Sequence, residues 1–299
     1  MTVLTTPARA KINLCLFIGP VRTDGQHEVV TLMDSLTLCD DVRMETSAPG
    51  LLVDEVVCPA VPGPNLAAAA LRAFRDTTGW DGPPVRLEID KRIPIAGGMA
   101  GGSADAAAAL RLAAEASGLG DRRELEEIAA GLGADVASQV RGGLVLATGS
   151  GSRLRPLSMS LSYSVVVVPV DAELSAAAVY AEADRLGLPR DPLDLARSLT
   201  RTQAALSAET ILDCVHNDLQ DAARSLCPAV DKALEATLAA GADHALVSGS
   251  GPTVVALFVG AGHRERAHRV CDSLVGEDRT PTPILSRPAG PISITRPFE

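Results

Sequence analysis

A glycine-rich loop that runs directly into an alanine-rich helix constrains this chain more than any other segment. The loop lies within residues 93–105 (IPIAGGMAGGSAD), and more alanines follow it. Its glycines are Gly97, Gly98, Gly101 and Gly102. Because they carry no Cβ, the backbone can approach a ligand closely and adopt positive φ. Ser103 is expected to be the N-cap of the helix. Amides left free beside it, with the positive helix end, would form a site for a phosphate-sized anion.

Two common nucleotide-binding motifs do not match this loop. The P-loop motif GxxxxGK[ST] needs a lysine after its last glycine, where this chain has Ser103. The dinucleotide fingerprint GxGxxG has a regular spacing and follows a strand end, whereas this loop follows Pro94. Glycine density alone also leaves open a purely structural alternative, in which the glycines only permit a tight turn before a capped helix.

The charge of the chain favours a ligand held by backbone rather than by a basic surface. The chain has 299 residues, with 27 Lys and Arg against 37 Asp and Glu, and a formal net charge of −10. This balance argues against a general nucleic-acid binder, which would present a basic face. Aromatic residues make up only 2% of the chain, so there is little material for platforms that stack bases.

Hydrophobic periodicity predicts an α+β chain with two domains, because strands and helices mix without strict βαβ alternation. Strands are expected at 10–18, 28–38, 41–46, 51–57, 85–89, 142–147, 165–170, 244–248 and 253–259. Helices are expected at 65–78, 103–117, 121–131, 174–186, 194–206, 208–225, 228–240 and 262–274. A change of composition over 149–162 predicts a boundary between domains 1–157 and 158–299.

Neither a membrane nor a secreted protein is predicted. Residues 1–10 lack an apolar run beside a cationic segment, and the longest apolar stretch, at 165–170, is far shorter than the roughly 20 residues of a spanning helix. The six cysteines form no CxxC, which favours buried thiols in a reducing cytosol over disulfides or a zinc site. We therefore expect a cytoplasmic protein without membrane or nucleic-acid partners.

Further segments, read together with the glycine loop, resemble the GHMP kinase superfamily, named for galacto-, homoserine, mevalonate and phosphomevalonate kinases. They are residues 10–14 (AKINL), 24–28 (DGQHE), 132–136 (LGADV) and 247–253 (VSGSGPT). Their order and spacing over nearly the whole chain are similar to those of the family. The resemblance implies a ribosomal-protein-S5-domain-2-like N-terminal domain, a ferredoxin-like C-terminal domain, and an active site in the cleft between them.

The resemblance also implies the chemistry of an ATP-dependent kinase. Asp135 would be the catalytic base that accepts the proton of an acceptor hydroxyl as its oxygen attacks the γ-phosphorus of ATP. Lys11 would lie beside Asp135 and counter the charge of the phosphoryl group. These roles agree with phosphoryl transfer in general, where catalysis is mostly positioning and electrostatic stabilisation.

The nucleotide end of the site would include the glycine loop and two residues from outside it. The loop would cradle the phosphates of ATP, with Ser103 near Mg²⁺ or a phosphate oxygen. Asn65 and Lys91 match positions near the adenine. Asn65 could equally be only the N-cap of the helix that follows it.

The acceptor end would include Asn13, His27 and the turn Ser248, Gly249, Ser250 and Gly251. The branch of the family that this chain most resembles phosphorylates a methylerythritol linked to cytidine diphosphate. That branch stacks an aromatic ring on cytosine where this chain has Gln26. Tyr180 matches the position of a second stacking ring. Since a base–aromatic stack is worth about 1–3 kcal/mol, the loss of one ring weakens the expected hold on cytosine.

Two acceptors therefore stay open. The missing ring favours a sugar, polyol or cyclitol, or its monophosphate, in a specialised biosynthetic pathway, and the overall resemblance favours the cytidine-diphospho substrate of isoprenoid biosynthesis. A catalytically silent GHMP-fold sensor is a third hypothesis, and the presence of Lys11 and Asp135 argues against it. A nicotinamide-binding oxidoreductase is a fourth, against which the absence of a regular GxGxxG argues. Both a monomer and a homodimer remain possible.

Overall fold

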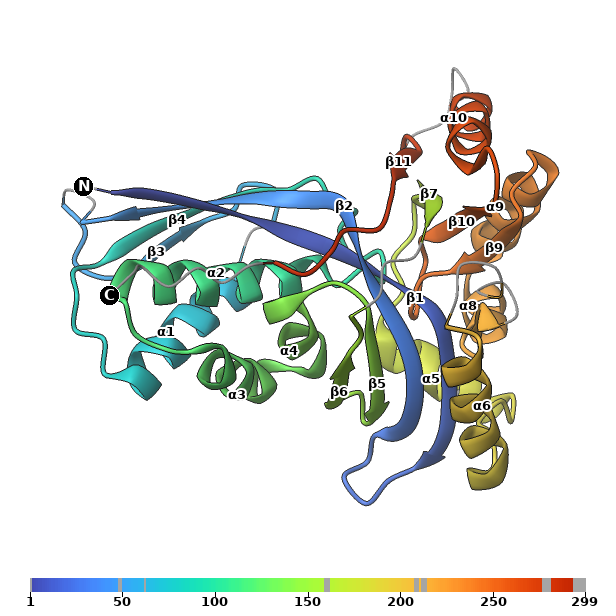
Figure 1. The fold of residues 1–299 in the computed structure, drawn as a ribbon, viewed down its shortest axis with the longest axis horizontal. Coiled ribbons are helices and arrows are strands. Elements are labelled where there is room, and N and C mark those ends of the chain that lie inside the picture. The colour runs from blue at the N-terminus through green and yellow to red at the C-terminus, as the bar shows by residue number, and fades with distance from the viewer. Residues whose placement is uncertain are drawn as a thin grey trace.

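The computed structural model describes residues 2–47, 50–61, 63–158, 162–206, 210, 214–275 and 281–292, and it confirms the predicted two-domain α+β fold (Figure 1). The first sheet has the order β3-β4-β2-β1-β8, and β5 pairs with both β2 and β6. Its strands are β1 (Val3–Val21), β2 (His27–Thr46), β3 (Glu55–Val57), β4 (Val85–Asp90), β5 (Val145–Gly149), β6 (Arg153–Pro156) and β8 (His216–Asn217).

The antiparallel pair of β1 and β2 runs the length of the first domain. Residues 28–38 and 41–46, predicted as separate strands, are parts of the single strand β2. Its first half pairs with β5 and its second half with β4. The register of β1 against β2 shifts between Arg9 and Lys11 and again between Asn13 and Cys15. Such irregularities re-aim side chains, and these two flank Lys11 and Asn13, both of which belong to the candidate site.

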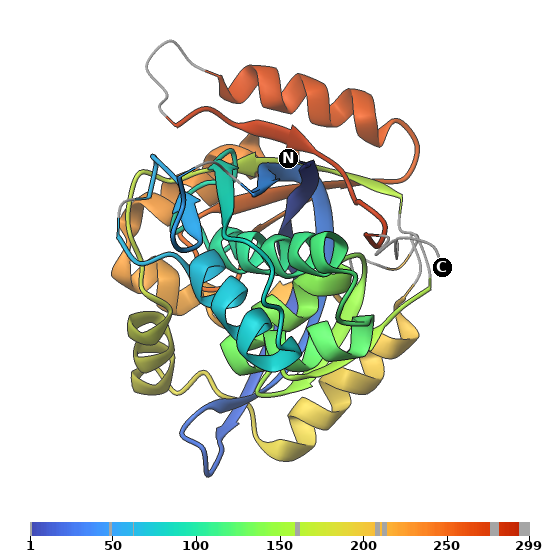
Figure 2. The same ribbon diagram turned by 90° about the vertical axis from the view of Figure 1, so that its left-hand side faces the viewer.

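Helices α1 (Leu66–Thr78), α2 (Gly101–Ser117), α3 (Arg122–Leu132) and α4 (Ala134–Arg141) pack on one side of this sheet, and in Figure 2 they stand in front of its strands. Residues 104–114 of α2 are all buried. A helix that is buried around its whole circumference needs neighbours on every side. The alanine run meets this need, because its small side chains let α2 lie between the sheet and the other helices.

The second sheet has the order β11-β7-β10-β9, in which β7 (Tyr163–Val168), β9 (His244–Val247), β10 (Val254–Val259) and β11 (Ile284–Ser286) are antiparallel neighbours. The helices that follow β6 along the chain are α5 (Ala176–Arg185), α6 (Pro192–Ala204), α8 (Gln220–Leu226), α9 (Pro228–Ala239) and α10 (His263–Leu274). Of these, α6 packs against β1 and β2 of the first sheet. Numbered in chain order, the four strands lie 4-1-3-2, with helices after the first and third. This confirms the expected ferredoxin-like arrangement.

Two later segments of the chain return to the first sheet. The short strand β8 pairs with β1, within the range 208–225 that was predicted as a helix. That prediction is wrong for residues 215–219, which form β8 with the residue before it and the turn after it, and it is confirmed for residues 220–225, which belong to a helix. Residues 208–209 and 211–213 of the predicted range lie outside the described part. After β11, the backbone N–H of Thr37 donates to the carbonyl of Arg287 at 2.9 Å, and that of Ile292 donates to Arg141 at 2.7 Å. The boundary between the predicted domains 1–157 and 158–299 stays a prediction.

Within the described residues, no helix combines the length and apolar character needed to cross a bilayer. The six cysteines, all of which lie within the described residues, form no disulfide bond.

A buried hydrogen bond joins the two sheets. The Tyr163 hydroxyl on β7 donates to Oδ2 of Asp34 on β2 at 2.8 Å, and both residues are at most 3% exposed. Burial raises the pKa of Asp34 to about 7, although hydrogen bonds from Tyr163 and the Ser35 backbone oppose this shift.

Replacing this carboxyl by an amide should therefore stabilise the protein at alkaline pH. The native carboxyl keeps a proton that an unfolded Asp, with a pKa of about 3.9, has lost, so wild-type stability falls as the pH rises from about 4 to about 7. We expect Asp34→Asn to raise the free energy of unfolding by up to roughly 4 kcal/mol at about pH 8 and by little at about pH 4. Denaturant unfolding at several pH values measures this. Asp41→Asn, at an exposed position of the same strand, is the control, and a gain independent of pH would contradict the prediction.

Candidate active site

A cleft of about 790 Å³ contains most of the predicted site residues. It is lined by the glycine loop, the start of α4, one face of α5 and the turn between β9 and β10. The predicted residues in its lining are Lys11, Asn13, Asn65, Lys91, Gly97, Gly98, Gly101, Gly102, Ser103, Asp135, Tyr180, Gly249, Ser250 and Gly251. Gln26, His27 and Ser248 lie outside the lining.

The start of α2 differs from the prediction in a way that favours an anion site. The N-cap of α2 is Ala100, which has a φ of 56°, and the helix begins at Gly101. Ser103 is therefore not the N-cap, because the left-handed turn at Ala100 lets the helix start earlier. No side chain caps this end of α2. The first-turn amides can thus donate to ligand oxygens, where the positive helix end attracts them.

The glycine loop and the turn between β9 and β10 approach each other closely, backbone against backbone, and one side-chain hydroxyl adds a hydrogen bond. Gly98 has a φ of +72°, and a Cβ on it would lie 2.1 Å from the carbonyl oxygen of Ser248. A Cβ on Gly249, whose φ is +57°, would lie 3.0 Å from the carbonyl oxygen of Gly98. The Ser248 hydroxyl donates to that carbonyl at 3.3 Å. Two loops about 150 residues apart in sequence therefore meet at a distance that side chains would prevent.

Lys11 and Asp135 form an ion pair in the cleft, with 3.9 Å between Nζ and Oδ2. The Lys11 side chain is 8% exposed and Asp135 is 47% exposed. Lys11 also donates to Oδ1 of Asn13 at 2.8 Å, and Asn13 in turn donates to the hydroxyl of Thr31 at 2.7 Å. Asp135 stands in the first turn of α4. The carboxylate thus meets the positive helix end and an oriented ammonium, while it stays open to a substrate.

The part of the cleft predicted to bind the nucleotide holds a buried cluster of charges. Lys91 donates to Oδ2 of Asp105 at 2.7 Å and also to Oδ2 of Asp40. Burial opposes the charge of Lys91, but these hydrogen bonds raise its pKa overall. Burial also raises the pKa of Asp105 to about 7. Asn65 does act as the N-cap of α1, since its Oδ1 accepts from the amide of Ala67 at 2.8 Å, and it also lines the cleft.

The part of the cleft predicted to bind the acceptor has an aromatic wall. The Tyr180 ring lines the cleft and stacks on His27, with 5.3 Å between ring centroids and 29° between planes. Burial, and then the charge of Asp135, raise the pKa of Tyr180 to about 12, so its ring is neutral at physiological pH. His27 is buried; its Nδ1 lies 2.8 Å from the carbonyl oxygen of Gly19. His27 therefore supports Tyr180 from behind.

Gln26 is exposed in the turn between β1 and β2, outside the lining of the cleft. Other residues of the lining were not among the predicted site residues, and the polar side chain of Thr31 and the turn residues Ser150 and Gly151 are examples. Thr31 lies in the expected strand 28–38, but the sequence did not show that Asn13 would donate a hydrogen bond to its hydroxyl. Ser150 and Gly151 form the hairpin turn between β5 and β6, where the sequence TGSG signals only a turn.

The contact between the two loops should depend on the absence of a side chain at Gly98. We expect Gly98→Ala to lower the free energy of unfolding by more than about 1–3 kcal/mol, the cost of a strained backbone alone, because the new methyl group also collides with the Ser248 carbonyl. Thermal unfolding measures the loss. Gly102→Ala is the matched control, since no atom lies within 4 Å of its Cβ position. Equal melting temperatures for the two variants would contradict this account.

Both halves of the sequence match GHMP kinase domains. Residues 65–151 match the GHMP kinases N terminal domain, and residues 195–277 match the GHMP kinases C terminal domain.

Curated relatives match over most of their length. A 4-diphosphocytidyl-2-C-methyl-D-erythritol kinase of Salinispora tropica is 41% identical over 272 residues, which cover 86% of this chain and 84% of the relative. The enzyme of the same name from Streptomyces coelicolor is 42% identical over 267 residues, covering 86% and 88%.

Solved structures agree with the sequence matches. A crystal structure of 4-(cytidine 5'-diphospho)-2C-methyl-D-erythritol kinase superposes with a TM-score of 0.75 at 28% identity, covering 96% of this chain and 100% of that one. The mevalonate kinase of L. major, in complex with R-mevalonate, shares the fold, with a TM-score of 0.71 at 19% identity and 97% of each chain covered. The chain therefore belongs to the GHMP kinase family and is an ATP-dependent phosphotransferase with an alcohol group as acceptor.

Proposed function

We propose that this protein transfers the γ-phosphoryl group of ATP to a hydroxyl of 4-diphosphocytidyl-2-C-methyl-D-erythritol. The observation that carries the proposal is the Lys11–Asp135 pair, which lies in the same cleft as the uncapped start of α2 and the Tyr180 ring. The choice of acceptor is supported by relatives of that name, which are about 40% identical over more than four-fifths of both chains.

In this mechanism the acceptor hydroxyl lies against Asp135. The carboxylate takes the hydroxyl proton as the oxygen forms a bond to the γ-phosphorus, and the bond from that phosphorus to the β,γ-bridging oxygen breaks, so that ADP leaves with the electron pair. Lys11 stabilises the negative charge of the phosphoryl group in transit. The free amides of the glycine loop and of α2 hold the remaining phosphate oxygens and cost no reorganisation.

The residues present also fit Mg²⁺. Among the described residues, no group of three or more His, Cys, Asp or Glu side chains could hold a metal ion by itself. Mg²⁺ usually keeps several waters and binds through few protein groups together with substrate phosphates, so Ser103 on the first turn of α2 is a suitable protein partner. When bound, the ion would neutralise charge on the phosphates.

The acceptor alternative, a sugar or cyclitol phosphate, depended on the missing ring at Gln26. That side chain is exposed and outside the cleft lining, so its identity is a weak argument against cytidine. Tyr180 offers one stacking face, and the relatives' names favour the cytidine-diphospho acceptor.

An acceptor panel tests the proposal directly. With ATP and Mg²⁺, we expect kcat/KM for 4-diphosphocytidyl-2-C-methyl-D-erythritol to exceed that for sugar and cyclitol phosphates by about 100-fold or more, since a polar site discriminates strongly against ligands that leave its groups unpaired. Coupled detection of ADP measures the rates. Asp135→Asn serves as control and should lose most of the turnover while it still binds ATP. A cyclitol or sugar phosphate as the best acceptor would overturn the choice of substrate.

Tyr180 should contribute to acceptor binding through its ring. We expect Tyr180→Ala to raise KM for the cytidine acceptor by roughly 5- to 150-fold, the equivalent of a lost stack of about 1–3 kcal/mol, and to leave KM for ATP nearly unchanged. Tyr180→Phe keeps the ring and should stay close to wild type. If both variants behave alike, or if KM for ATP rises as much, Tyr180 does not stack on the acceptor.

A further inference from the structure

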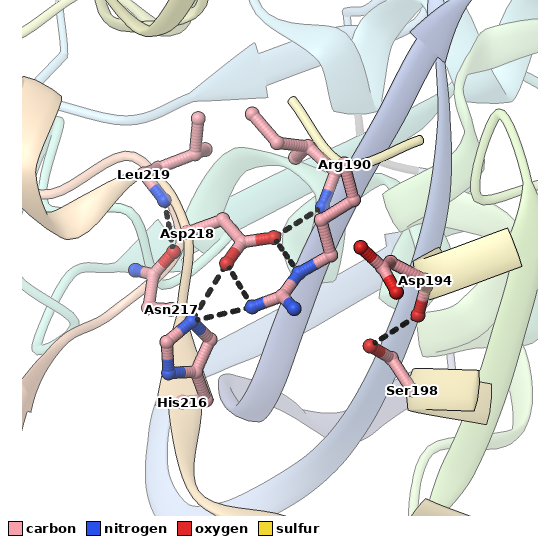
Figure 3. Close-up of polar contacts among 8 residues, drawn as sticks. Arg190, Asp194, Ser198, His216, Asn217, Asp218 and Leu219 are labelled. Carbon is pink, nitrogen blue, oxygen red and sulfur yellow. Dashed lines mark hydrogen bonds and ion pairs between the residues drawn. The ribbon is translucent and has the colours of Figure 1, made fainter. Parts of the chain in front are cut away.

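The segment from His216 to Leu219 lies where the two sheets meet (Figure 3). Its first two residues form β8, which pairs in parallel with β1 at Cys15 and Leu16. The strand that carries Lys11 and Asn13 is therefore the direct neighbour of this segment. Leu219, at its other end, lines the cleft.

The Asn217 side chain uses all of its polar atoms within the fold. Its Nδ2 donates to the carbonyl oxygens of Val247 at 2.8 Å and of Gly249 at 2.7 Å. Its Oδ1 accepts from the amide of Leu219 at 2.9 Å, a contact drawn in Figure 3. The residue is 6% exposed. One amide group on the edge of the first sheet thus binds the turn of the second sheet on both sides of Ser248.

That turn touches the reacting end of the cleft. A Cβ on Gly249 would lie 3.5 Å from Nζ of Lys11, and the Ser248 hydroxyl donates to the carbonyl of Gly98. A shift of the turn would therefore change the space around Lys11 and displace the glycine loop, because the loop and the turn are in backbone contact.

We propose that Asn217 is a positioning residue for nucleotide binding. By holding the carbonyls of Val247 and Gly249, it keeps the turn at the distance from the glycine loop that phosphate binding needs. The proposal rests on the proposed function in one respect, that ATP binds in this cleft.

Asp218 provides a matched control, because its side chain is also buried, with 7% exposed, but its hydrogen bonds go to residues outside the turn between β9 and β10. It accepts two hydrogen bonds from Arg190, each at 2.7 Å, as Figure 3 shows, and one from the amide of Ile18 at 3.0 Å. His216 lies against the same carboxylate, with 2.6 Å between Nε2 and Oδ1. These contacts tie β8 to β1 and to the segment before α6, and removing them tests the stability of the region without touching the turn.

The experiment measures the Kd of the full-length protein for ATP by isothermal titration calorimetry, together with thermal unfolding. Asn217→Ala leaves the two carbonyls unpaired, and Asn217→Asp places an acceptor oxygen against them. For both variants we expect Kd for ATP to rise by about 10-fold or more, the equivalent of about 1.4 kcal/mol. For Asp218→Asn we expect a lower melting temperature with Kd within about 2-fold of wild type. Asn217→Ser retains one donor and should fall between wild type and Asn217→Ala, which gives a readout if the alanine variant does not fold.

The outcomes separate the two proposals. Loss of folded protein lowers the stoichiometry of binding rather than the affinity, so a raised Kd at normal stoichiometry supports the positioning role. Wild-type Kd in the Asn217 variants, or an equal rise in Asp218→Asn, would overturn that role and leave the kinase function intact. Failure of the wild-type protein to bind ATP would instead contradict the proposed function, and the inference with it.

Discussion

The backbone contact between Gly98 and the turn at Ser248 and Gly249 determines how closely the two domains approach. It joins a loop of the first domain to a turn of the second at a distance that leaves little room for a Cβ on either glycine, and both glycines have positive φ. The uncapped start of α2 and the Lys11–Asp135 pair line the same cleft as this contact. The absence of a Cβ at Gly98 and Gly249 therefore lets the loop and the turn form adjoining walls of one cleft.

The distribution of charge agrees with the proposal that this acidic protein binds the polyanion ATP. Lys91 pairs with two buried carboxylates, so its charge is balanced within the fold. Lys11 is held by Asn13 and faces Asp135, where charge would develop in the proposed mechanism. In the same proposal, backbone amides at the start of α2 attract phosphate and add no net charge to the surface.

Local signals predicted the elements and most of the site but not their exact limits. Strands were expected at 28–38 and 41–46, whereas the structure has a single strand β2 and buries Asp40 within it, where Lys91, 51 residues away, pairs with it. Residues 216–217 read as part of a helix, but pairing with β1, about 200 residues earlier, makes them a strand. In both cases a partner distant in sequence outweighs local propensity.

The sequence by itself determined the kinase family, the two-domain α+β fold and many of the residues that line the cleft, because glycines, an alanine run and charged residues at set spacings report local backbone and chemistry. Tertiary structure alone decided the early start of α2 at Gly101, the support of Tyr180 by His27, the removal of Gln26 from the cleft lining, and the hold of Asn217 on the turn of the second sheet. Each of these depends on distances between segments that only the packing of the two sheets sets, and no local pattern of residues encodes such a distance.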